Sequence, residues 1–312
     1  MSPPPPLDPE LAPVIEALPP VVVREDTLAA VRQRPRPPVL LSDAVVRTDH
    51  VVAAGPAAPA VAVRVHRAVD AEGEGRLPCL VSMHGGGLVL GSHTGDDALF
   101  DEWCPALGVV GVAVDYRLAP EAPYPCALED CCAALRWAHD EADVLGIDRT
   151  RIGVRGISAG AGLAAALALL ARDRGIDVAF QLLDSPMLDD RQITASSRQD
   201  RLAVWTREAN AFGWRAYLGA LCGTDAVPPT AAAARATDLA GLSPAFVSVG
   251  SADGFHDEAV DYARRLEQAG VPCELHVYAG APHGYHLAGD TSIARRAKQD
   301  VAAWLARIIE AK

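Results

Sequence analysis

The chain has 312 residues, half of them hydrophobic, which is enough to bury the core of one large domain or of a domain with a small appendage. Its net charge is −12 at pH 7 and no run of Lys or Arg offers a track for phosphates, which argues against nucleic acids and anionic membranes as partners. The seven cysteines are odd in number and lack metal-ligand spacing, so we expect free thiols in a reducing compartment and no metal.

The N-terminal stretch, MSPPPPLDPELAP, lacks the basic and apolar regions of a signal peptide, so the protein is expected to be cytoplasmic. Asp8 followed by Pro9 is typical of a helix start, and predicts a first helix that Pro13 would bend. A second helix is predicted at residues 24–34, before PRPP ends it. Residues 61–65 then carry valine at every second position, as a half-buried strand does.

From residue 77 onward, short apolar segments rich in valine alternate with helical patterns. The expected strands are LPCLVSMH, VVGVAVDYR, RIGVRG, VAFQLL, AFVSVG and CELHVYA. The expected helices lie near residues 95–107, 125–145, 159–172, 256–270 and 292–309. Apolar strands that alternate with helices predict an α/β fold with a mostly parallel sheet and helices on both faces. The longest apolar stretch, residues 159–171, is too short to span a bilayer.

Two segments fall outside this alternation, residues 1–45 and 185–225. The second segment carries four large aromatic side chains, Trp205, Phe212, Trp214 and Tyr217. Three of them share a helical stretch, and they suit either the core or the wall of a pocket. The last expected strand, CELHVYA, should lie at or near a sheet edge with only Glu274 to discourage pairing, which makes it a candidate homodimer contact.

The stretch RGISAGAG, residues 155–162, joins the end of a strand, one serine and the start of a helix. A nucleophilic serine must be exposed, and it gains from the positive potential of a helix start. A sharp strand-to-helix turn meets these needs but brings the backbone so close that Gly156 and Gly160 must flank it. The pattern G-x-S-x-G predicts Ser158 as a nucleophile and the N–H of Ala159 as an oxyanion donor. In a chain rich in Gly and Ala, the alternative is a chance match.

Three consecutive glycines, Gly85, Gly86 and Gly87, follow His84 at the end of the strand LPCLVSM. Such glycines leave backbone N–H groups free to point at a ligand, and the oxyanion that forms when a carbonyl is attacked needs such donors. A tight turn and a phosphate cradle are the alternatives, but a cradle would be followed by Lys or a G-x-G-x-x-G helix start, and LVLGSH follows here. The pattern predicts an oxyanion loop, and leaves open which glycines donate.

A serine nucleophile needs a base, and His283 in GAPHGYH is the first candidate. It follows the last strand, which places it at the carboxyl edge of the sheet, where Ser158 also lies. Asp253 follows AFVSVG in the loop before a helix and is the expected orienting acid. The chain order Ser158, Asp253, His283 is the order that this type of fold requires.

Other histidines and acids compete for these roles. His286 is expected to head away along the segment that leads to the last helix, His256 to sit with the acids at a helix start, and His93 to follow the oxyanion loop. Asp257 and Glu258 are expected on the first turn of the helix after Asp253, where acids complement the helix dipole.

Together these motifs resemble the bacterial hormone-sensitive-lipase family of α/β-hydrolases, over about residue 40 to the C-terminus. The matching segments are HGGG at 84–87, DYRLAPEAPYPCALED at 115–130, GISAG at 156–160, QLLDSPMLDDR at 181–191, SADGFHDE at 251–258 and APHGY at 281–285. The resemblance implies an α/β-hydrolase catalytic domain at residues 46–312, with helical cap segments at 1–45 and 185–225. It also implies a triad of Ser158, Asp253 and His283, and an oxyanion hole formed by Gly85, Gly86, Gly87 and Ala159.

Three positions depart from the family pattern. Ile157 stands where an acidic or small polar residue is usual, Ala161 where a second glycine is common, and Gly254-Phe255 where Pro-Leu or a hydrophobic pair is common. None removes a predicted catalytic group. Within DYRLAPE, Arg117 and Glu121 are interpreted as a structural pair that fixes the turn. Arg155 is unusual for a buried strand, and the sequence offers no partner for it.

These residues predict a serine carboxylesterase that hydrolyses short-chain acyl esters through an acyl-enzyme, with no cofactor and a small-molecule ester as its partner. An amidase or an acyltransferase would share the same acyl-enzyme, so the sequence leaves both open. A non-catalytic small-molecule receptor on the same scaffold is a further alternative, but such proteins lose a member of the triad and this chain keeps all three.

Overall fold

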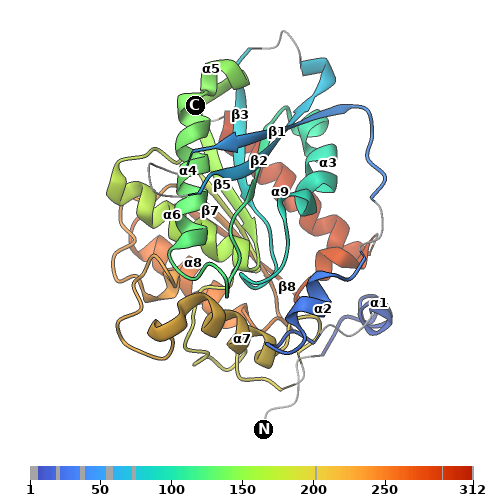
Figure 1. Ribbon diagram of the computed structural model, residues 1–312. Helices are drawn as coiled ribbons and strands as arrows, with labels where there is room; N and C mark the ends of the chain where they lie inside the picture. Colours follow the sequence, from blue (N-terminus) through green and yellow to red (C-terminus); the bar gives the residue numbers. More distant parts are fainter. Residues whose placement is uncertain are drawn as a thin grey trace.

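The computed structural model describes residues 6–18, 22–35, 39–53, 59–71, 75–200, 202–289 and 291–310. These residues form an eight-stranded sheet in the order β1-β2-β4-β3-β5-β6-β7-β8 (Figure 1). The strands are β1 (Val45–Val52), β2 (Val61–Ala68), β3 (Leu77–Met83), β4 (Val110–Asp115), β5 (Ile147–Ile157), β6 (Gln181–Asp184), β7 (Ala245–Gly250) and β8 (Cys273–Tyr278). β1, β2 and β4 pair antiparallel, and all pairs from β4 to β8 are parallel. The mostly parallel sheet is therefore confirmed.

Helices cover both faces of this sheet. The α-helices are α1 (Ala12–Ala17), α2 (Leu28–Arg32), α3 (Asp97–Leu107), α4 (Cys126–Asp140), α5 (Ala142–Leu145), α6 (Ala159–Arg174), α7 (Arg207–Leu218), α8 (His256–Gln268) and α9 (Ser292–Glu310). α3 and α9 pack together on one face, and α4 and α6 pack together on the other (Figure 1). The central strands are apolar throughout because they are buried on both sides, with β3, for instance, buried over its whole length.

The two N-terminal helices are shorter than the sequence predicted. α1 begins at Ala12 rather than after Asp8, so Pro13 lies in its first turn, where proline is tolerated, and does not bend it. Residues 24–27 form a turn ahead of α2, in which the Thr27 hydroxyl accepts a hydrogen bond from the Arg24 N–H and donates one to the Val22 carbonyl. This side chain competes with helical hydrogen bonding, and α2 starts only at Leu28.

The expected pairing of Arg117 with Glu121 is wrong. Arg117 instead forms a bidentate ion pair with Asp130 of α4, at 2.7 Å. Glu121 pairs with Arg32 of α2, also at 2.7 Å. One ion pair thus joins the turn at residues 117–121 to α4, and the other joins the same turn to α2, so the turn is held from two sides.

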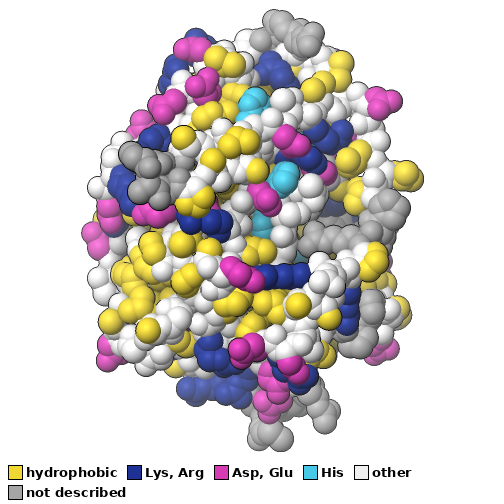
Figure 2. Space-filling model, in the orientation of Figure 1, with side chains coloured by type: hydrophobic (Ala, Val, Ile, Leu, Met, Phe, Trp, Pro, Cys, Tyr) yellow, Lys and Arg dark blue, Asp and Glu magenta, His cyan; other side chains and the backbone are white. Residues whose placement is uncertain are grey.

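No helix in the described part of the chain is long and apolar enough to cross a membrane. On the face shown in Figure 2, acidic and basic side chains are interspersed rather than gathered into a field of one sign. The described residues also contain no group of three or more His, Cys, Asp or Glu side chains suited to hold a metal ion.

Candidate active site

Ser158 occupies the sharp turn between β5 and α6. Its φ of +57° lies in a region that residues with a side chain rarely adopt. The flanking glycines are required by space, because a Cβ on Gly156 would come within 2.2 Å of the Gly160 carbonyl group, and one on Gly160 within 2.1 Å of the Met83 oxygen. The elbow that the sequence predicted is present, with the positive end of α6 directly behind the serine.

Neighbouring strands hold this turn in place. The Ser158 N–H donates to the Asp184 carbonyl at 2.8 Å, and the Ser158 carbonyl accepts from the Met187 N–H at 3.1 Å. The Asp184 carboxylate in turn accepts hydrogen bonds from the hydroxyls of Ser248 and Tyr285, each at 2.9 Å. The unusual backbone of Ser158 is thus determined by β6 and its continuation as well as by its own helix.

The three residues predicted for chemistry lie in one hydrogen-bonded row. His283 Nε2 is 3.0 Å from Ser158 Oγ, and His283 Nδ1 is 2.8 Å from Asp253 Oδ2. The second oxygen of Asp253 accepts from the Phe255 N–H at 3.0 Å, which fixes the carboxylate. All three side chains are buried. This geometry allows a proton to move from the serine to an imidazole that an acid holds in one orientation.

Two opposing influences set the protonation of His283. Burial alone would lower the pKa of its imidazole, but the adjacent Asp253 carboxylate, through its charge and its hydrogen bond, leaves that pKa above the usual value of 6.5. The ring can accept the serine proton only when it is neutral, so it is a competent base only at a pH above this raised pKa.

The competing side chains have other partners. His93 faces Asp115 at 3.0 Å and His256 faces Asp257 at 2.9 Å, and neither is hydrogen-bonded to Ser158. His286 lies in the short turn Tyr285–Ala288 that leads toward α9, and it lines a cavity to which Ser158 and His283 do not contribute. Asp257 and Glu258 lie on the first turn of α8, as expected, but the Glu258 side chain is buried.

The glycine loop passes in front of the elbow. Gly86 and Gly87 have φ values of +125° and +61°, and the Gly86 carbonyl closes a tight turn by accepting from Leu90 N at 2.9 Å. No hydrogen bond within the described part of the chain takes the N–H of Gly86 or Gly87. A Cβ on Gly85 would lie 3.5 Å from Ser158 Cβ, so the start of the loop is in contact with the serine.

Comparisons with known proteins place the chain in a family. A family profile described as the alpha/beta hydrolase fold matches residues 80–287. Esterase LipI of Mycobacterium tuberculosis is 35% identical over 287 residues, which cover 90% of this chain and 88% of LipI. The chain belongs to the hormone-sensitive-lipase-like α/β-hydrolases.

Further relatives agree with this assignment. Carboxylesterase NlhH of Mycobacterium tuberculosis is 34% identical over 290 residues, covering 90% of this hydrolase and 89% of NlhH. The solved structure of a bacterial heroin esterase superposes with a TM-score of 0.89 at 36% identity, and covers 97% of this chain and 98% of that chain.

Residues 202–205, which precede α7 in this hydrolase, touch the loops of Asp253 and His283 and the glycine loop. A Cβ placed on Gly254, next to Asp253, would be 2.7 Å from Leu202, and one on Gly284, next to His283, would be 3.3 Å from Val204. A Cβ on Gly87 would be 2.2 Å from the Trp205 ring. This short segment therefore lies against the acid loop, the base loop and the glycine loop together.

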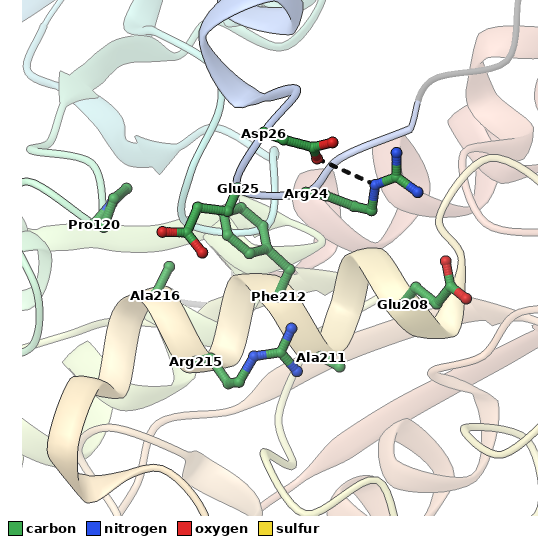
Figure 3. A pocket seen from close by; sticks show the side chains of 9 residues that line it. All are labelled: Arg24, Glu25, Asp26, Pro120, Glu208, Ala211, Phe212, Arg215 and Ala216. Carbon is green, nitrogen blue, oxygen red and sulfur yellow. Dashed lines mark hydrogen bonds and ion pairs between the residues drawn. The ribbon is translucent and has the colours of Figure 1, made fainter.

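The aromatic residues of this region divide between the two roles that the sequence left open. Trp214 and Tyr217 of α7 are buried in the core, whereas Trp205 is half-buried against the glycine loop. Phe212 is also buried, and its ring edge contributes to a groove of about 770 Å³ between α7 and residues 24–26 (Figure 3). The two segments that fell outside the strand–helix alternation thus face each other across this groove.

The N-terminal segment is also fastened to the glycine loop. Arg32 of α2 donates to the Val89 carbonyl at 2.9 Å and to the Ala119 carbonyl at 2.7 Å, besides its ion pair with Glu121. One guanidinium therefore joins α2, the end of the glycine loop and the turn at residues 117–121. No local pattern predicts this contact, because the partners of Arg32 are 57 to 89 residues away in the chain.

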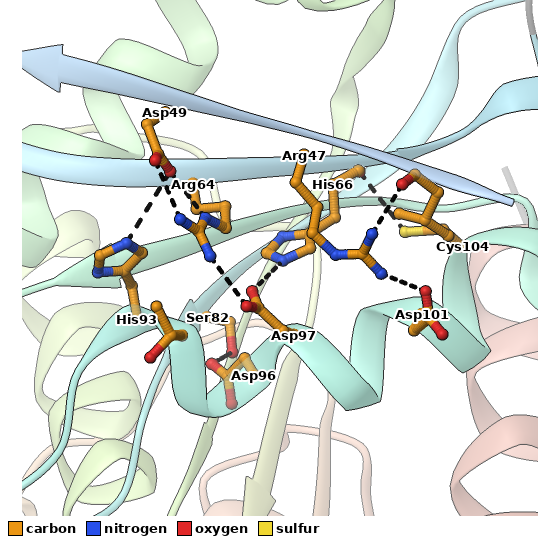
Figure 4. A network of polar contacts seen from close by, with 12 residues as sticks. Arg47, Asp49, Arg64, His66, Ser82, His93, Asp96, Asp97, Asp101 and Cys104 are labelled. Carbon is orange, nitrogen blue, oxygen red and sulfur yellow. Dashed lines mark hydrogen bonds and ion pairs between the residues drawn. The ribbon is translucent and has the colours of Figure 1, made fainter. Parts of the chain in front are cut away.

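Arg155, which the sequence left without a partner, forms a buried ion pair. Its Nη1 donates to Asp96 at 2.9 Å and to the Ser82 hydroxyl at 2.9 Å, and its guanidinium lies 5.8 Å from the centre of the Trp103 ring. Figure 4 shows Ser82 and Asp96 beside the network that joins Arg64, Asp97 and His66. The charge on β5 is tolerated because a carboxylate at the start of α3 compensates it.

Proposed function

We propose that the protein is a serine carboxylesterase with Ser158 as nucleophile, His283 as general base and Asp253 as the orienting acid. The observation that carries this proposal is the continuous row from Ser158 Oγ through the His283 ring to Asp253, set at the end of β5 beside an open glycine loop. The names of the relatives, esterase and carboxylesterase, support ester bonds as the target.

The reaction follows from this row. His283 takes the hydroxyl proton as Ser158 attacks the ester carbonyl, and then gives that proton to the departing alcohol, which leaves the acyl group on the serine. Water, deprotonated by the same ring, attacks the acyl group, and the proton returns to the serine as the acid departs. Asp253 holds the ring and stabilises its positive charge in both halves of the reaction.

The oxyanion that forms in each half needs fixed donors. We assign this role to the N–H groups of the glycine loop, Gly85, Gly86 and Gly87, together with that of Ala159 at the start of α6. Each donor aimed at the developing charge is worth about 3 kcal/mol of transition-state stabilisation. The left-handed turn at Gly86 and Gly87 supports this role, since it leaves their N–H groups uncommitted.

We further propose that residues 1–45 and 185–225 form a cap over the hydrolase domain at residues 46–312. Contacts of residues 202–205 with three site loops, and of Arg32 with the glycine loop, support it. The Trp205 ring, packed against Gly87, limits the space for an acyl chain, so chains of about two to six carbons should be preferred.

Two finer assignments complete the proposal. A homodimer through β8 is supported by the position of β8 at the end of the sheet and by its half-exposed side chains Leu275 and Val277. A reducing, cytoplasmic setting is supported by the seven cysteines, all of which are free thiols.

A substrate series tests the reaction class. Hydrolysis of 4-nitrophenyl esters with acyl chains of two to twelve carbons, compared with 4-nitroanilides of the same acids, should show kcat/KM highest at two to six carbons and far lower for every anilide. Equal or faster cleavage of the anilides would assign an amidase instead. Acyl transfer to added alcohols in preference to water would assign an acyltransferase.

A further inference from the structure

A short N-terminal segment lies against the loop that carries His283. We call residues 8–11 the strap, and residues 279–289, which follow β8, the base loop. The Asp8 N–H donates to the Gly280 carbonyl at 3.0 Å. A Cβ on Gly280 would lie 2.5 Å from the Asp8 nitrogen, so there is no room for a side chain between the two segments. The backbone of the strap is therefore in direct contact with the base loop just before His283.

The strap also contributes a buried apolar side chain. Leu11 is fully buried, and it belongs to a small apolar cluster that is separate from the main core around the sheet. The other buried members described for this cluster lie in the base loop, in β8 or in α9, and are Tyr278, Ala281, Tyr285, Ala288 and Ala297. They stand on both sides of His283 in the chain. Leu11 thus packs among residues that flank the histidine.

The strap is fastened a second time, beyond His283. The Glu10 carboxylate accepts hydrogen bonds from the Ser292 N–H, at 2.9 and 3.0 Å to its two oxygens, and from the Ser292 hydroxyl. Ser292 is the first residue of α9, and a carboxylate at this end also complements the helix dipole. The strap therefore has one attachment before the histidine and one after it.

The base loop is also in contact with the acid loop. The Gly280 N–H donates to the Ser251 hydroxyl at 2.8 Å, and the Ala281 carbonyl accepts from the Ala252 N–H at 2.9 Å. Both partners directly precede Asp253 in the chain. Residues 280 and 281 are consequently held by the strap and by the loop of the orienting acid together. Removal of the strap would leave the hydrogen bonds to the acid loop but take away those on the N-terminal side.

The proposed chemistry requires His283 to meet two partners at once, because Nε2 lies 3.0 Å from Ser158 Oγ and Nδ1 lies 2.8 Å from Asp253. A misplacement of about 1 Å can cost a factor of about 10² in rate. In the base loop the described regular structure is one short 3-10 turn at residues 285–288. The position of the histidine therefore depends on what packs against the loop.

We propose that the strap holds His283 in its reactive position, with Leu11 as a positioning residue that acts through the base loop. The Tyr285 hydroxyl ties the middle of the loop to Asp184, whereas the strap ties the chain on either side of it. This role rests on the proposed function, in which His283 is the base. Without Leu11 the base loop should open locally more often, and in the open form Nε2 does not meet the serine.

Steady-state hydrolysis of 4-nitrophenyl butanoate tests the role of Leu11. Leu11→Ala should lower kcat about tenfold or more and change KM by less than about threefold, because the glycine loop and residue 205 beside it are unchanged. Leu11→Met fills a similar volume and should restore kcat to within about threefold of the native value. Ile15→Ala removes a buried side chain of the same size from α1, outside the Leu11 cluster, and should leave kcat within about twofold.

Hydrogen–deuterium exchange measured by mass spectrometry gives a readout that does not depend on catalysis. In Leu11→Ala the amides of residues 279–289 should exchange about fivefold faster or more than in the native protein, while those of α4 exchange at the native rate. Faster exchange over the whole chain would mean that Leu11 stabilises the fold in general, and would overturn the proposal.

Native kcat in Leu11→Ala, or a lower kcat with unchanged exchange in the base loop, would overturn it as well. A native protein that hydrolyses no ester removes the proposed function, and the exchange of the base loop then decides alone whether the strap orders it.

Discussion

Asp253 accepts one hydrogen bond on each carboxylate oxygen, from the Phe255 N–H and from His283 Nδ1. The first bond fixes the acid in its loop, and the second fixes both the orientation of the imidazole and its tautomer, with Nε2 left to accept the serine proton. Burial of the whole row strengthens these charged hydrogen bonds because little water competes for them. The raised pKa of His283 is the measurable consequence.

The pH dependence of kcat/KM should report this pKa. Since only the neutral ring is a base, activity falls as pH decreases, with a midpoint above 6.5 because Asp253 holds the His283 pKa above that value. In Asp253→Asn the carboxylate is lost, so kcat should fall by about 10⁴ as the tautomer changes. His256→Gln serves as the control, and should keep both the midpoint and the rate to within a few-fold. A midpoint below 6.5 in the native protein would contradict the role of Asp253.

Glu258 shows how a buried acid can serve structure instead of chemistry. Its Oε1 accepts from the Leu188 N–H at 2.7 Å, next to Met187, whose N–H binds the Ser158 carbonyl. Burial raises the pKa of Glu258 well above its usual range, so this carboxyl stays protonated at a pH where the unfolded chain would ionise it.

Two substitutions at Glu258 should therefore have different effects on stability. Glu258→Ala leaves the Leu188 N–H buried and unpaired, and should lower the free energy of unfolding by about 1–3 kcal/mol. Glu258→Gln keeps an acceptor and cannot ionise. The native protein loses stability through this group as pH rises above about 4.5, the ordinary pKa of Glu. Urea unfolding should show that the free energy of unfolding of Glu258→Gln, relative to that of the native protein, is higher at pH 8 than at pH 5. The same difference between the two proteins at both pH values would show that Glu258 is not a buried neutral acid.

At the scale of elements, residues 202–205 are the segment that joins α7 to the site. They contact glycines in all three site loops, and α7 itself packs so closely that a Cβ on Gly213 would be 2.6 Å from the Gly87 carbonyl oxygen. A helix that fits this tightly against the glycine loop also restrains that loop. The length of acyl chain that the enzyme accepts should therefore depend on the size of the side chain at position 205.

Trp205→Ala should move the acyl-chain optimum to longer esters. Removing the indole opens space beside Gly87, so kcat/KM for esters of eight to ten carbons should rise at least fivefold relative to that for the two-carbon ester. Trp137→Ala is a matched control that removes the same side chain from α4, away from the site loops. An unchanged chain-length profile in Trp205→Ala would show that another element limits the pocket.

For the whole molecule, the two edges of the sheet differ. β1 ends one side and pairs antiparallel with β2, whereas β8 ends the other side and pairs parallel with β7. The outward face of β8 carries Leu275 and Val277, both partly exposed, while His276 on its other face contacts Asp300 of α9. An open strand with exposed apolar side chains is suited to pairing with a second copy.

Light scattering should find a dimer at tens of micromolar that Val277→Lys converts largely to monomer. If two β8 strands pair across a two-fold axis, the lysine introduced in one copy lies near the same lysine of the other copy, and the two positive charges repel. Val51→Lys places the same charge on the opposite edge, in β1, and should leave the dimer intact. A monomeric native protein would remove the proposed contact, without affecting the ester site.

The sequence predicted the strands from β2 to β8 because each is a short, local apolar pattern bounded by turns, but it did not predict β1, whose side chains are mostly exposed or half-buried. The elbow was also predictable, since the crowded turn leaves no space for a Cβ at Gly156 or Gly160 and this requirement is visible in the local sequence. The ion pairs of Arg117 and Arg155 were not, because the chain brings Asp130 and Asp96 to them only after folding, and one sequence gives no signal for such distant pairs. The burial of Glu258 was missed for the same reason, since Leu188 is 70 residues away.

The central claim is that Ser158 is the nucleophile, and the most direct test is the mass of the protein after reaction with diethyl 4-nitrophenyl phosphate. The native protein should gain one diethylphosphoryl group per chain on the peptide that contains Ser158, and lose esterase activity in proportion. Ser158→Ala should gain no such group, stay folded, and keep less than about a thousandth of the native kcat/KM. A phosphoryl group on another residue, or a Ser158→Ala variant that hydrolyses esters at near the native rate, would contradict the assignment.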